Sequence, residues 1–463
     1  MATQLIQPQR INHLNDRDVC QGDYVLYWME QSQRAQCNHA LEFAIRRANE
    51  IQQRLLVLFV IADDDEQLTL RQATFMIEGL RQTQTELQTR GIKLVVRCGN
   101  PTDVVCGVAR NASLVVCDRG YLRHQRSWRQ SVASEAPCQV VQVESDAIVP
   151  VDLVSVHREY AARTLRPKLH DHLDEFLVEL STTPIEKDSM NVSVQGEDVA
   201  ELDSEAGKFQ VDRSVPAVPE LFRGGTSQAN ARLERFIEDK LSQYEDDRSR
   251  PELQSLSYMS PYLHFGQISP LAIALKIQNT SAGTQSDRES YLEELLVRRE
   301  LSQNFTNFTE DYDSFSCLPD WATETLEHHR DDPREHHYTF SELENAETHD
   351  DYWNAAMREM RCTGYMHNHM RMYWGKQILA WTNTPEYAHR VALTLNNKYF
   401  LDGRDANSFA NVAWIFGNHD RAFGERDVFG KVRTMTRSGL ERKADPDQYV
   451  RRVNKRCETL SES

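Results

Sequence analysis

Hydrophobic and polar residues follow two alternating patterns over roughly the first 150 positions of the chain. Nearly continuous runs of Val, Leu and Ile occur at 23–29, 55–61, 92–98, 113–118 and 139–144. The segments between these runs, at 38–51, 74–87 and 103–110, repeat their apolar residues with the period of an amphipathic helix. Buried strands separated by helices are typical of a parallel sheet that is covered on both faces. The pattern therefore predicts a doubly wound, Rossmann-like α/β domain over residues 1–181.

The pattern changes at residues 182–215, which are polar, acidic and without a period. Such a composition predicts a linker or a long surface connection. Beyond it the strand pattern disappears, and long helical patterns occur at 230–244, 268–278, 287–305 and 367–382. We therefore expect an all-α domain over residues 216–463.

Composition adds limits on the class of protein. The 463 residues are 40% hydrophobic and 27% charged, and no run approaches the roughly 18 apolar residues that a membrane helix needs. The N-terminus does not resemble a secretory signal, so we expect a cytoplasmic protein, associated with the nucleoid if the source is prokaryotic. Nine cysteines without a C-x-x-C pair suit reduced thiols. We predict a solvated loop and no metal site for the histidines in the acidic stretch 327–338, which are His328, His329, His336 and His337.

The formal net charge of −17 argues against indiscriminate nucleic-acid binding, because phosphates attract Lys and Arg. The charge is uneven, however, since basic residues recur from Arg421 to Arg456 and could form a basic face. The α/β region has neither G-x-G-x-x-G nor G-x-x-x-x-G-K-[ST] after its first strand. A cofactor would therefore have to be bound in another way.

Candidate chemistry is concentrated in the helical region. Glu294 and Arg298 are spaced i, i+4, which fits an ordinary exposed ion pair. A stripe of residues shares one helix face and mixes a charge with two indoles: Arg371, Trp374, Ile378 and Trp381. This stripe suits core packing or, with Trp353 nearby, electron hopping. Asp402 would need a cation if buried, and Arg371 is the obvious one. The residues alone predict a polar, aromatic-lined pocket without naming its ligand.

Motifs spread along nearly the whole chain resemble those of the class II cyclobutane pyrimidine dimer (CPD) photolyases. They include YVLYWM, SYMSPYLHFGQIS, LEELLVRRELSQNF, MRMYWGKQILAW, LDGRDAN and GKVR, in the expected order. The resemblance implies an α/β antenna-type domain, a connector and a helical domain that holds FAD. It also implies light-driven repair of thymine dimers in double-stranded DNA by a monomeric protein, with reduced, anionic FAD as the electron donor. An antenna chromophore of unknown identity is possible in the α/β domain.

The resemblance assigns roles to particular residues. FAD would be held by Tyr244, Leu256, Ser257, Tyr258, Met259, Ser260, Asn368, Arg371, Asn396 and Asp402. Glu294, Asn396, Arg371 and Asp402 would serve catalysis. The dimer and its DNA would be contacted by Arg248, Glu294, Met372, Trp414, Asp420, Arg421 and Arg426, with Lys431 beside them. The segment GNHDRAFGE departs from the class pattern around Asp420. Trp353, Trp374 and Trp381 would transfer electrons, while Val412 stands where other classes carry a flavin-proximal tryptophan.

Three alternatives remain at this point. A cryptochrome-like photoreceptor would share the cofactor but not the repair activity, and the implied dimer contacts Glu294, Met372 and Trp414 argue against it. A (6-4) photolyase should carry a histidine pair over the lesion, which has no match here. An electron-transferring or nucleotide-binding α/β protein would fit only the first 150 residues and leave the helical region unexplained.

Overall fold

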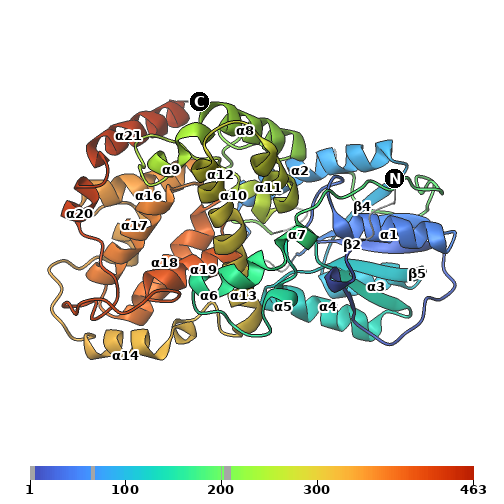
Figure 1. Cartoon of the computed structure of the whole chain (residues 1–463), viewed down its shortest axis with the longest axis horizontal. Helices are drawn as coiled ribbons and strands as arrows, with labels where there is room; N and C mark the ends of the chain where they lie inside the picture. The colour runs from blue at the N-terminus through green and yellow to red at the C-terminus, as the bar shows by residue number, and fades with distance from the viewer. Residues whose placement is uncertain (1–5, 64–67, 200, 203–209, 463) are drawn as a thin grey trace. The chain divides into compact units, whose positions relative to one another are not determined.

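The computed structural model describes residues 6–63, 68–199, 201–202 and 210–462 (Figure 1). Its internal contacts divide the chain into two compact units. Unit 1 comprises Met1–Val156, Pro167–Glu234 and Tyr258–Thr280, and unit 2 comprises His157–Arg166, Arg235–Ser257 and Ser281–Ser463. The division into 1–181, 182–215 and 216–463 stays a prediction.

Unit 1 contains a six-stranded sheet with the order β1-β6-β5-β2-β3-β4. Its strands are β1 (Ile11–His13), β2 (Tyr24–Met29), β3 (Arg54–Ile61), β4 (Lys93–Cys98), β5 (Ala112–Asp118) and β6 (Gln139–Val143). All neighbouring pairs are parallel except β1 and β6. The predicted α/β fold is confirmed, and its five predicted strands form the parallel part. The antiparallel edge strand β1 was not predicted, because three residues are too few to show an alternating pattern.

Four longer helices connect the parallel strands, namely α1 (His39–Glu50), α2 (Leu70–Thr89), α3 (Pro101–Ala109) and α4 (Arg123–Glu135). Right-handed crossovers place α1 and α2 on one face of the sheet and α3 and α4 on the other, and Figure 1 draws α1 and α3 on opposite sides of β5. Polar caps fix where helices start: the Asn38 side chain accepts from Leu41 N, and Thr69 forms a capping box with Gln72. Strand residues such as Leu26, Leu56 and Val115 fill the core.

The remaining helices of unit 1 are short, apart from two that continue into unit 2. They are η1 (Pro8–Arg10), α5 (Val151–Val154), α7 (Leu173–Phe176), α10 (Ser260–His264) and α11 (Pro270–Asn279). The two that cross between the units are α6 (Ala162–His170) and α8 (Thr226–Asp239).

The described part of 182–215 lies along the sheet edge. Ser189 Oγ accepts from Lys93 N at 2.8 Å, and Glu197 N donates to Val96 O at 2.7 Å. Val199 is fully buried. These contacts cover the edge strand β4, which would otherwise offer unpaired backbone groups. The rest of the predicted linker, at 200 and 203–209, lies outside the described residues.

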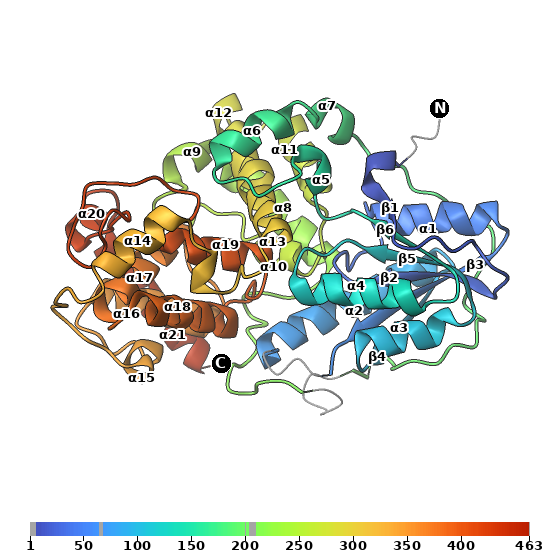
Figure 2. The same cartoon turned by 90° about the horizontal axis from the view of Figure 1, so that it is seen from below.

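The described elements of unit 2 are helical. They are η2 (Leu241–Gln243), α9 (Tyr244–Asp247), α12 (Gln285–Leu292), η3 (Glu293–Arg298), α13 (Arg299–Phe308), η4 (Phe315–Cys317), α14 (Asp320–His328), α15 (Phe340–Glu344), α16 (Asp351–Thr363), α17 (Asn368–Trp381), α18 (Pro385–Tyr399), α19 (Ala406–Ile415), α20 (Arg437–Glu441) and α21 (Pro446–Glu462). In sequence order, α16 to α19 pack each against the next, and Figure 2 shows α16, α17 and α18 side by side. Gly364, with φ of 71°, ends α16 in a left-handed conformation that glycine adopts without strain.

The acidic stretch 327–338 is more ordered than expected. His328 ends α14, while the His329 ring lies 2.6 Å from Asp332 and 3.0 Å from Glu425. His336 stacks on His349 with ring centroids 3.7 Å apart. Residues 329–338 form neither helix nor strand, and His328 and His337 are exposed, as the prediction of a solvated loop requires. His329 and His336 differ from it, because these contacts leave them half-buried.

No described helix is long and apolar enough to cross a bilayer. In the same part of the chain, no three His, Cys, Asp or Glu side chains group as metal ligands would.

Candidate functional site

A buried ion pair lies between α17 and the turn after α18. Arg371 Nη2 is 3.5 Å from Asp402 Oδ1, and both residues are 8% exposed. The Arg371 guanidinium also lies over the Phe400 ring, 3.8 Å from its centroid. Asn396, fully buried on α18, is linked to this turn because Phe400 N donates to Asn396 O. The structure thus joins Arg371 and Asp402 as the requirement for a buried counter-charge predicted.

A tight backbone turn positions Asp402. A Cβ atom at Gly403 would lie 2.7 Å from Asn397 O, so the turn has no room for a larger residue. Ser408 Oγ donates to Asp402 O at 3.0 Å, and the Asp405 side chain caps α19. The LDGRDAN motif therefore forms a rigid connection between α18 and α19, with Asp402 facing Arg371.

Three buried polar atoms on Arg371 and on residues of α17 and α18 have no hydrogen-bond partner in the described part of the chain. They are Arg371 Nε, Asn396 Oδ1 and Trp374 Nε1. Buried polar groups are normally paired, and each unpaired group costs about 1–3 kcal/mol. Two donors and one acceptor without partners therefore fit a polar ligand that supplies the missing contacts. A ligand with both hydrogen-bond acceptors and a hydrogen-bond donor has the required chemistry.

Three indoles form a continuous aromatic path, with Trp374 and Trp381 on α17 and Trp353 on α16. Trp353 is parallel to Trp374, with centroids 6.5 Å apart and an interplanar angle of 12°. Trp381 meets Trp353 at 5.6 Å and 65°. Trp353 Nε1 donates to Trp374 O, which fixes the ring orientation. Trp353 therefore lies between the other two, and the path starts next to Arg371, since Trp374 follows it by one helical turn.

The π-helical element η3 changes the ion pairs expected around Glu294. Arg298 Nε is 3.2 Å from Glu293, five residues earlier, while Glu294 binds Arg248 at 2.8 Å. In a π-helix, positions i and i+5 share a face, and such turns are frequent at functional sites. The predicted i, i+4 pair between Glu294 and Arg298 is therefore wrong. Arg248, which was predicted to hold DNA phosphate, is the observed partner of Glu294.

Arg298 was not predicted as a site residue. Its guanidinium lies 5.4 Å from the centroid of the half-buried Trp414 ring, and Glu293, its ion-pair partner, also binds Arg166 through two hydrogen bonds. A cation over an indole face is favourable and restrains both groups. Sequence spacing carried no signal for this contact, because α19 is distant along the chain. Met372 is half-buried on α17, next to Arg371.

The segment 244–260, which was predicted to hold FAD, is divided between the units. In unit 2, the buried Tyr244 packs against Tyr291, whose hydroxyl donates to Ser257 Oγ at 3.1 Å, and Leu256 is half-buried. In unit 1, Tyr258 has φ of 56° and packs on Phe222, Met259 is buried, and Ser260 begins α10. A positive φ is unusual for tyrosine and is a reason to look for function there. Asn368 is exposed at the start of α17.

A basic loop follows α19. Arg421, Arg426, Lys431 and Arg433 are all exposed within residues 421–433. Both carboxylate oxygens of Asp420 are bound by Arg433, at 3.0 and 3.2 Å. Asp420 therefore restrains the loop, and this contact occupies the carboxylate that was predicted to face the substrate.

One buried lysine was not predicted either. Lys376 Nζ donates to Ile415 O at the end of α19, and burial lowers the pKa of Lys376 to about 7. The lysine side chain thus satisfies a helix-terminal carbonyl next to Trp414.

Comparison with known proteins gives this arrangement a context. A family model described as DNA photolyase matches residues 25–187. A deoxyribodipyrimidine photo-lyase of Methanothermobacter thermautotrophicus is 46% identical over 97% of this chain and 99% of that protein. Two solved structures share the fold at 15–16% identity. A Synechocystis cryptochrome has a TM-score of 0.67 over 87% of this chain and 84% of its own. An archaeal photolyase from Sulfolobus tokodaii with two FAD molecules has a TM-score of 0.66 over 92% and 89%.

The chain belongs to the DNA photolyase family. Its identity to the archaeal relative extends over both units, including the helical region that the family model does not match. The fold alone does not separate repair from signalling, because a photolyase and a cryptochrome resemble it equally well.

Proposed function

We propose that the chain is a class II CPD photolyase, which uses light and reduced FAD to split pyrimidine dimers in DNA. The observation that carries the proposal is the buried Arg371–Asp402 pair, with unpartnered polar atoms around it, at the start of a path of three tryptophans. It occurs in a chain 46% identical over nearly its whole length to a deoxyribodipyrimidine photo-lyase.

The residues fit FAD, the cofactor that the family uses. When bound, FAD supplies the photochemistry, donating an electron to the dimer in its reduced state. Arg371, Asn396 and Asp402 would hold its ring system, and Arg371 would compensate negative charge there without having to move. Tyr244, Leu256, Ser257, Tyr258, Met259 and Ser260 would hold the rest of the cofactor, with Asn368 as a further contact.

The dimer must leave the DNA stack in order to bind, because bases that are stacked inside a duplex cannot reach a flavin pocket. Glu294 would accept hydrogen bonds from the bases, and Met372 and Trp414 would pack against them. Arg298 would restrain Trp414. Arg248, Arg421 and Arg426 would contact phosphates, which position DNA without reading its sequence. Asp420 would act by restraining the basic loop.

Assignment to class II has two supports in the helical unit. Val412 is 1% exposed at the position where other classes carry a tryptophan. The observed path instead runs through Trp374, Trp353 and Trp381, the residues that resemble the class II electron-transfer chain. The proposal further includes a monomeric protein that acts in the cytoplasm or nucleoid, and an antenna chromophore in the α/β domain.

The decisive experiment is repair of an oligonucleotide that carries one thymine dimer. We expect loss of the dimer under blue light with chemically reduced protein, and none in the dark. Bound flavin without light-dependent dimer loss would favour a cryptochrome-like photoreceptor. Protein that binds no flavin would contradict both functions.

A further inference from the structure

A single carboxylate connects the tryptophan path to a buried phenol. Asp350 precedes α16, and its Oδ1 accepts from Trp353 N at 2.9 Å. Its Oδ2 accepts from the Tyr373 hydroxyl at 2.5 Å. Tyr373 is also the chain neighbour of Trp374. Tyr373 is therefore linked to Trp374 through the backbone of α17 and to the backbone N–H of Trp353 through one carboxylate.

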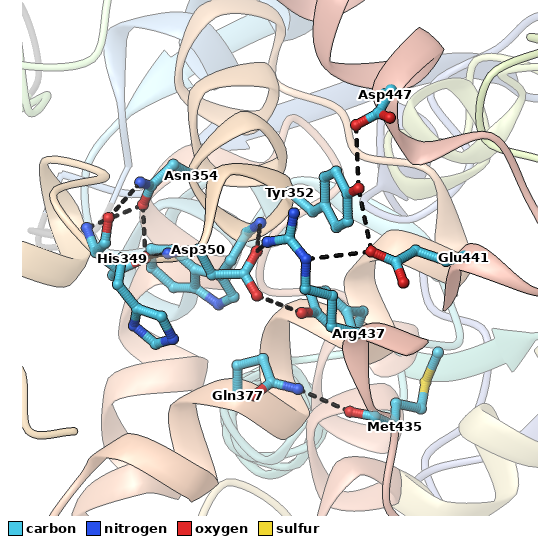
Figure 3. A network of polar contacts seen from close by, with 12 residues as sticks. His349, Asp350, Tyr352, Asn354, Gln377, Met435, Arg437, Glu441 and Asp447 are labelled. Atoms are coloured by element: carbon cyan, nitrogen blue, oxygen red, sulfur yellow. Dashed lines mark hydrogen bonds and ion pairs between the residues drawn. The ribbon is translucent and has the colours of Figure 1, made fainter. Parts of the chain in front are cut away.

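Asp350 and Tyr373 form their hydrogen bond in a buried site beside one guanidinium. Asp350 and Tyr373 are 4% and 1% exposed, so water does not compete for their hydrogen bond. The Arg437 guanidinium faces the carboxylate at 3.7 Å, covers the Tyr352 ring and binds Glu441 (Figure 3). Arg437 is thus held in place by partners other than Asp350, and Asp350 keeps the Trp353 N–H contact in either protonation state.

Burial, and then the charge of Asp350, raises the pKa of Tyr373 above its ordinary value. The phenol therefore keeps its proton in the resting protein. Loss of an electron reverses this preference, because an oxidised phenol is a strong acid. A hydrogen-bonded base is then needed at the same moment, and Asp350 is already in place.

We propose that Tyr373 and Asp350 form a redox-active pair: Tyr373 gives an electron to the oxidised tryptophan path while its proton moves to Asp350. The inference rests on the proposed function, because a light-excited, oxidised flavin must first remove an electron from the path. The pair would retain the oxidising equivalent on Tyr373 as a neutral radical and slow its recombination with the reduced flavin.

The step is balanced between two side chains and one indole. It begins with a Trp353 radical cation, the neutral Tyr373 phenol and the ionised Asp350 carboxylate. One electron passes from the phenol to the indole, the phenol O–H bond breaks, and the proton bonds to Asp350 Oδ2. The products are neutral Trp353, a neutral tyrosyl radical and a carboxylic acid. The net charge of the three groups is zero before and after.

A second buried tyrosine provides a matched control. Tyr449 on α21 is fully buried, and its hydroxyl donates to Glu359 at 2.8 Å. Glu359 lies more than one turn beyond Trp353 on α16 and does not cap that helix. Tyr449→Phe therefore removes a buried phenol–carboxylate bond without touching the Asp350 bridge.

The test uses the FAD-loaded full chain with oxidised flavin, excited by a flash. Transient absorption and electron paramagnetic resonance of freeze-trapped samples detect the radicals. We expect a tyrosyl radical in the unmodified protein and in Tyr449→Phe. We expect its loss, with faster decay of the tryptophan radical, in Tyr373→Phe. Asp350→Asn should also lose it, although asparagine still caps α16.

Three outcomes would overturn the pair. The first is a tyrosyl radical that persists in Tyr373→Phe. The second is a tyrosyl radical that disappears only in Tyr338→Phe, which would place the radical on Tyr338, whose ring packs on Trp381 with centroids 5.4 Å apart. The third is Asp350→Asn with an undiminished tyrosyl signal.

An infrared measurement keeps the test decisive if Tyr373→Phe fails to fold or to retain FAD. Light-induced difference spectra of the unmodified protein should gain a carboxylic-acid band that Asp350→Asn lacks. Absence of that band overturns the proposal. The experiment also separates the pair from the proposed function. If the unmodified protein forms no tryptophan radical, the tryptophan path itself is contradicted. If it forms a tryptophan radical but no tyrosyl radical, only the Tyr373–Asp350 pair is contradicted.

Discussion

Breaking the Arg371–Asp402 pair tests whether this charge pair is as deeply buried as the structure shows. The two charged groups lie 3.5 Å apart with 10% of each side chain exposed. At an effective dielectric constant of roughly 20, two unit charges at that separation attract by about 5 kcal/mol before the cost of desolvation. Removal of one partner leaves the other charge buried and unpaired, which costs about 3–5 kcal/mol.

We therefore expect Asp402→Leu or Arg371→Met to lower the free energy of unfolding of FAD-free protein by about 3–5 kcal/mol. The double variant should be much closer to the unmodified protein, because it leaves no isolated charge. Urea unfolding followed by circular dichroism measures all four proteins, and the double-mutant cycle gives the coupling between the two side chains. FAD must be absent, since a ligand that binds only the folded state would add its own stabilisation.

An exposed pair provides the control. Arg47 and Glu50 on α1 approach to 2.6 Å, closer than the buried pair, but their side chains are 31% and 58% exposed. Arg47→Met should cost only about 0–1 kcal/mol. Equal costs at the two sites, or a double variant as unstable as Asp402→Leu, would refute the reasoning that burial sets the energy.

Four further predictions concern single residues. Burial lowers the pKa of Lys376 to about 7, whereas in the unfolded chain this lysine keeps its proton up to about pH 10.4. Between these two pH values the unfolded state binds one more proton than the folded state, so the free energy of unfolding should rise with pH. As the pH rises from 7 to 9, the free energy of unfolding of Lys376→Met should fall by about 2–3 kcal/mol relative to that of the unmodified protein. If the difference between the two free energies stays constant over this range, the lowered pKa of Lys376 is contradicted. Glu294→Ala should keep FAD but weaken dimer binding or repair by about 1–3 kcal/mol in single-turnover assays, while the exposed Glu289→Ala should not. Arg426→Gln should reduce the log–log salt slope of DNA binding by about 0.9, equally for damaged and undamaged DNA; an unchanged slope would place the DNA face elsewhere. Trp381→Phe should block photoreduction of oxidised FAD yet leave repair by chemically reduced protein intact, and unchanged photoreduction kinetics would remove it from the path.

Sequence was informative where a short-range rule determines structure. Continuous apolar runs such as Leu55–Ile61 are long enough to show a buried strand, and five strands were predicted in this way. The Arg371–Asp402 pair was also predictable, because a buried carboxylate needs a cation and Arg371 shares a helix face with the aromatic residues of the predicted pocket. Both cases depend on a property of the local sequence or on a strong energetic requirement.

Other contacts could not be predicted because they depend on backbone geometry or on distant segments. The i, i+4 rule assigned Arg298 to Glu294, but the π-helical turn shifts the neighbour to i+5 and gives Arg298 to Glu293. Glu294 in the same turn forms its ion pair with Arg248, which lies 46 positions earlier. No periodicity in the sequence marks such a turn.

The ion pairs of the helical unit differ in burial in a way that matches the roles proposed for them. Arg371 and Asp402 are almost completely buried, so their separation would leave a costly unpaired charge, and they should stay together throughout the reaction. Arg248 and Glu294 are 31% and 35% exposed, so water can replace either partner at little cost. In the proposed function, Glu294 would therefore exchange Arg248 for a base of the flipped dimer, and Arg248 would then bind phosphate. The π-helical turn would favour this exchange, because it gives Arg298 a partner in Glu293 and pairs Glu294 with Arg248, the residue that is proposed to contact DNA.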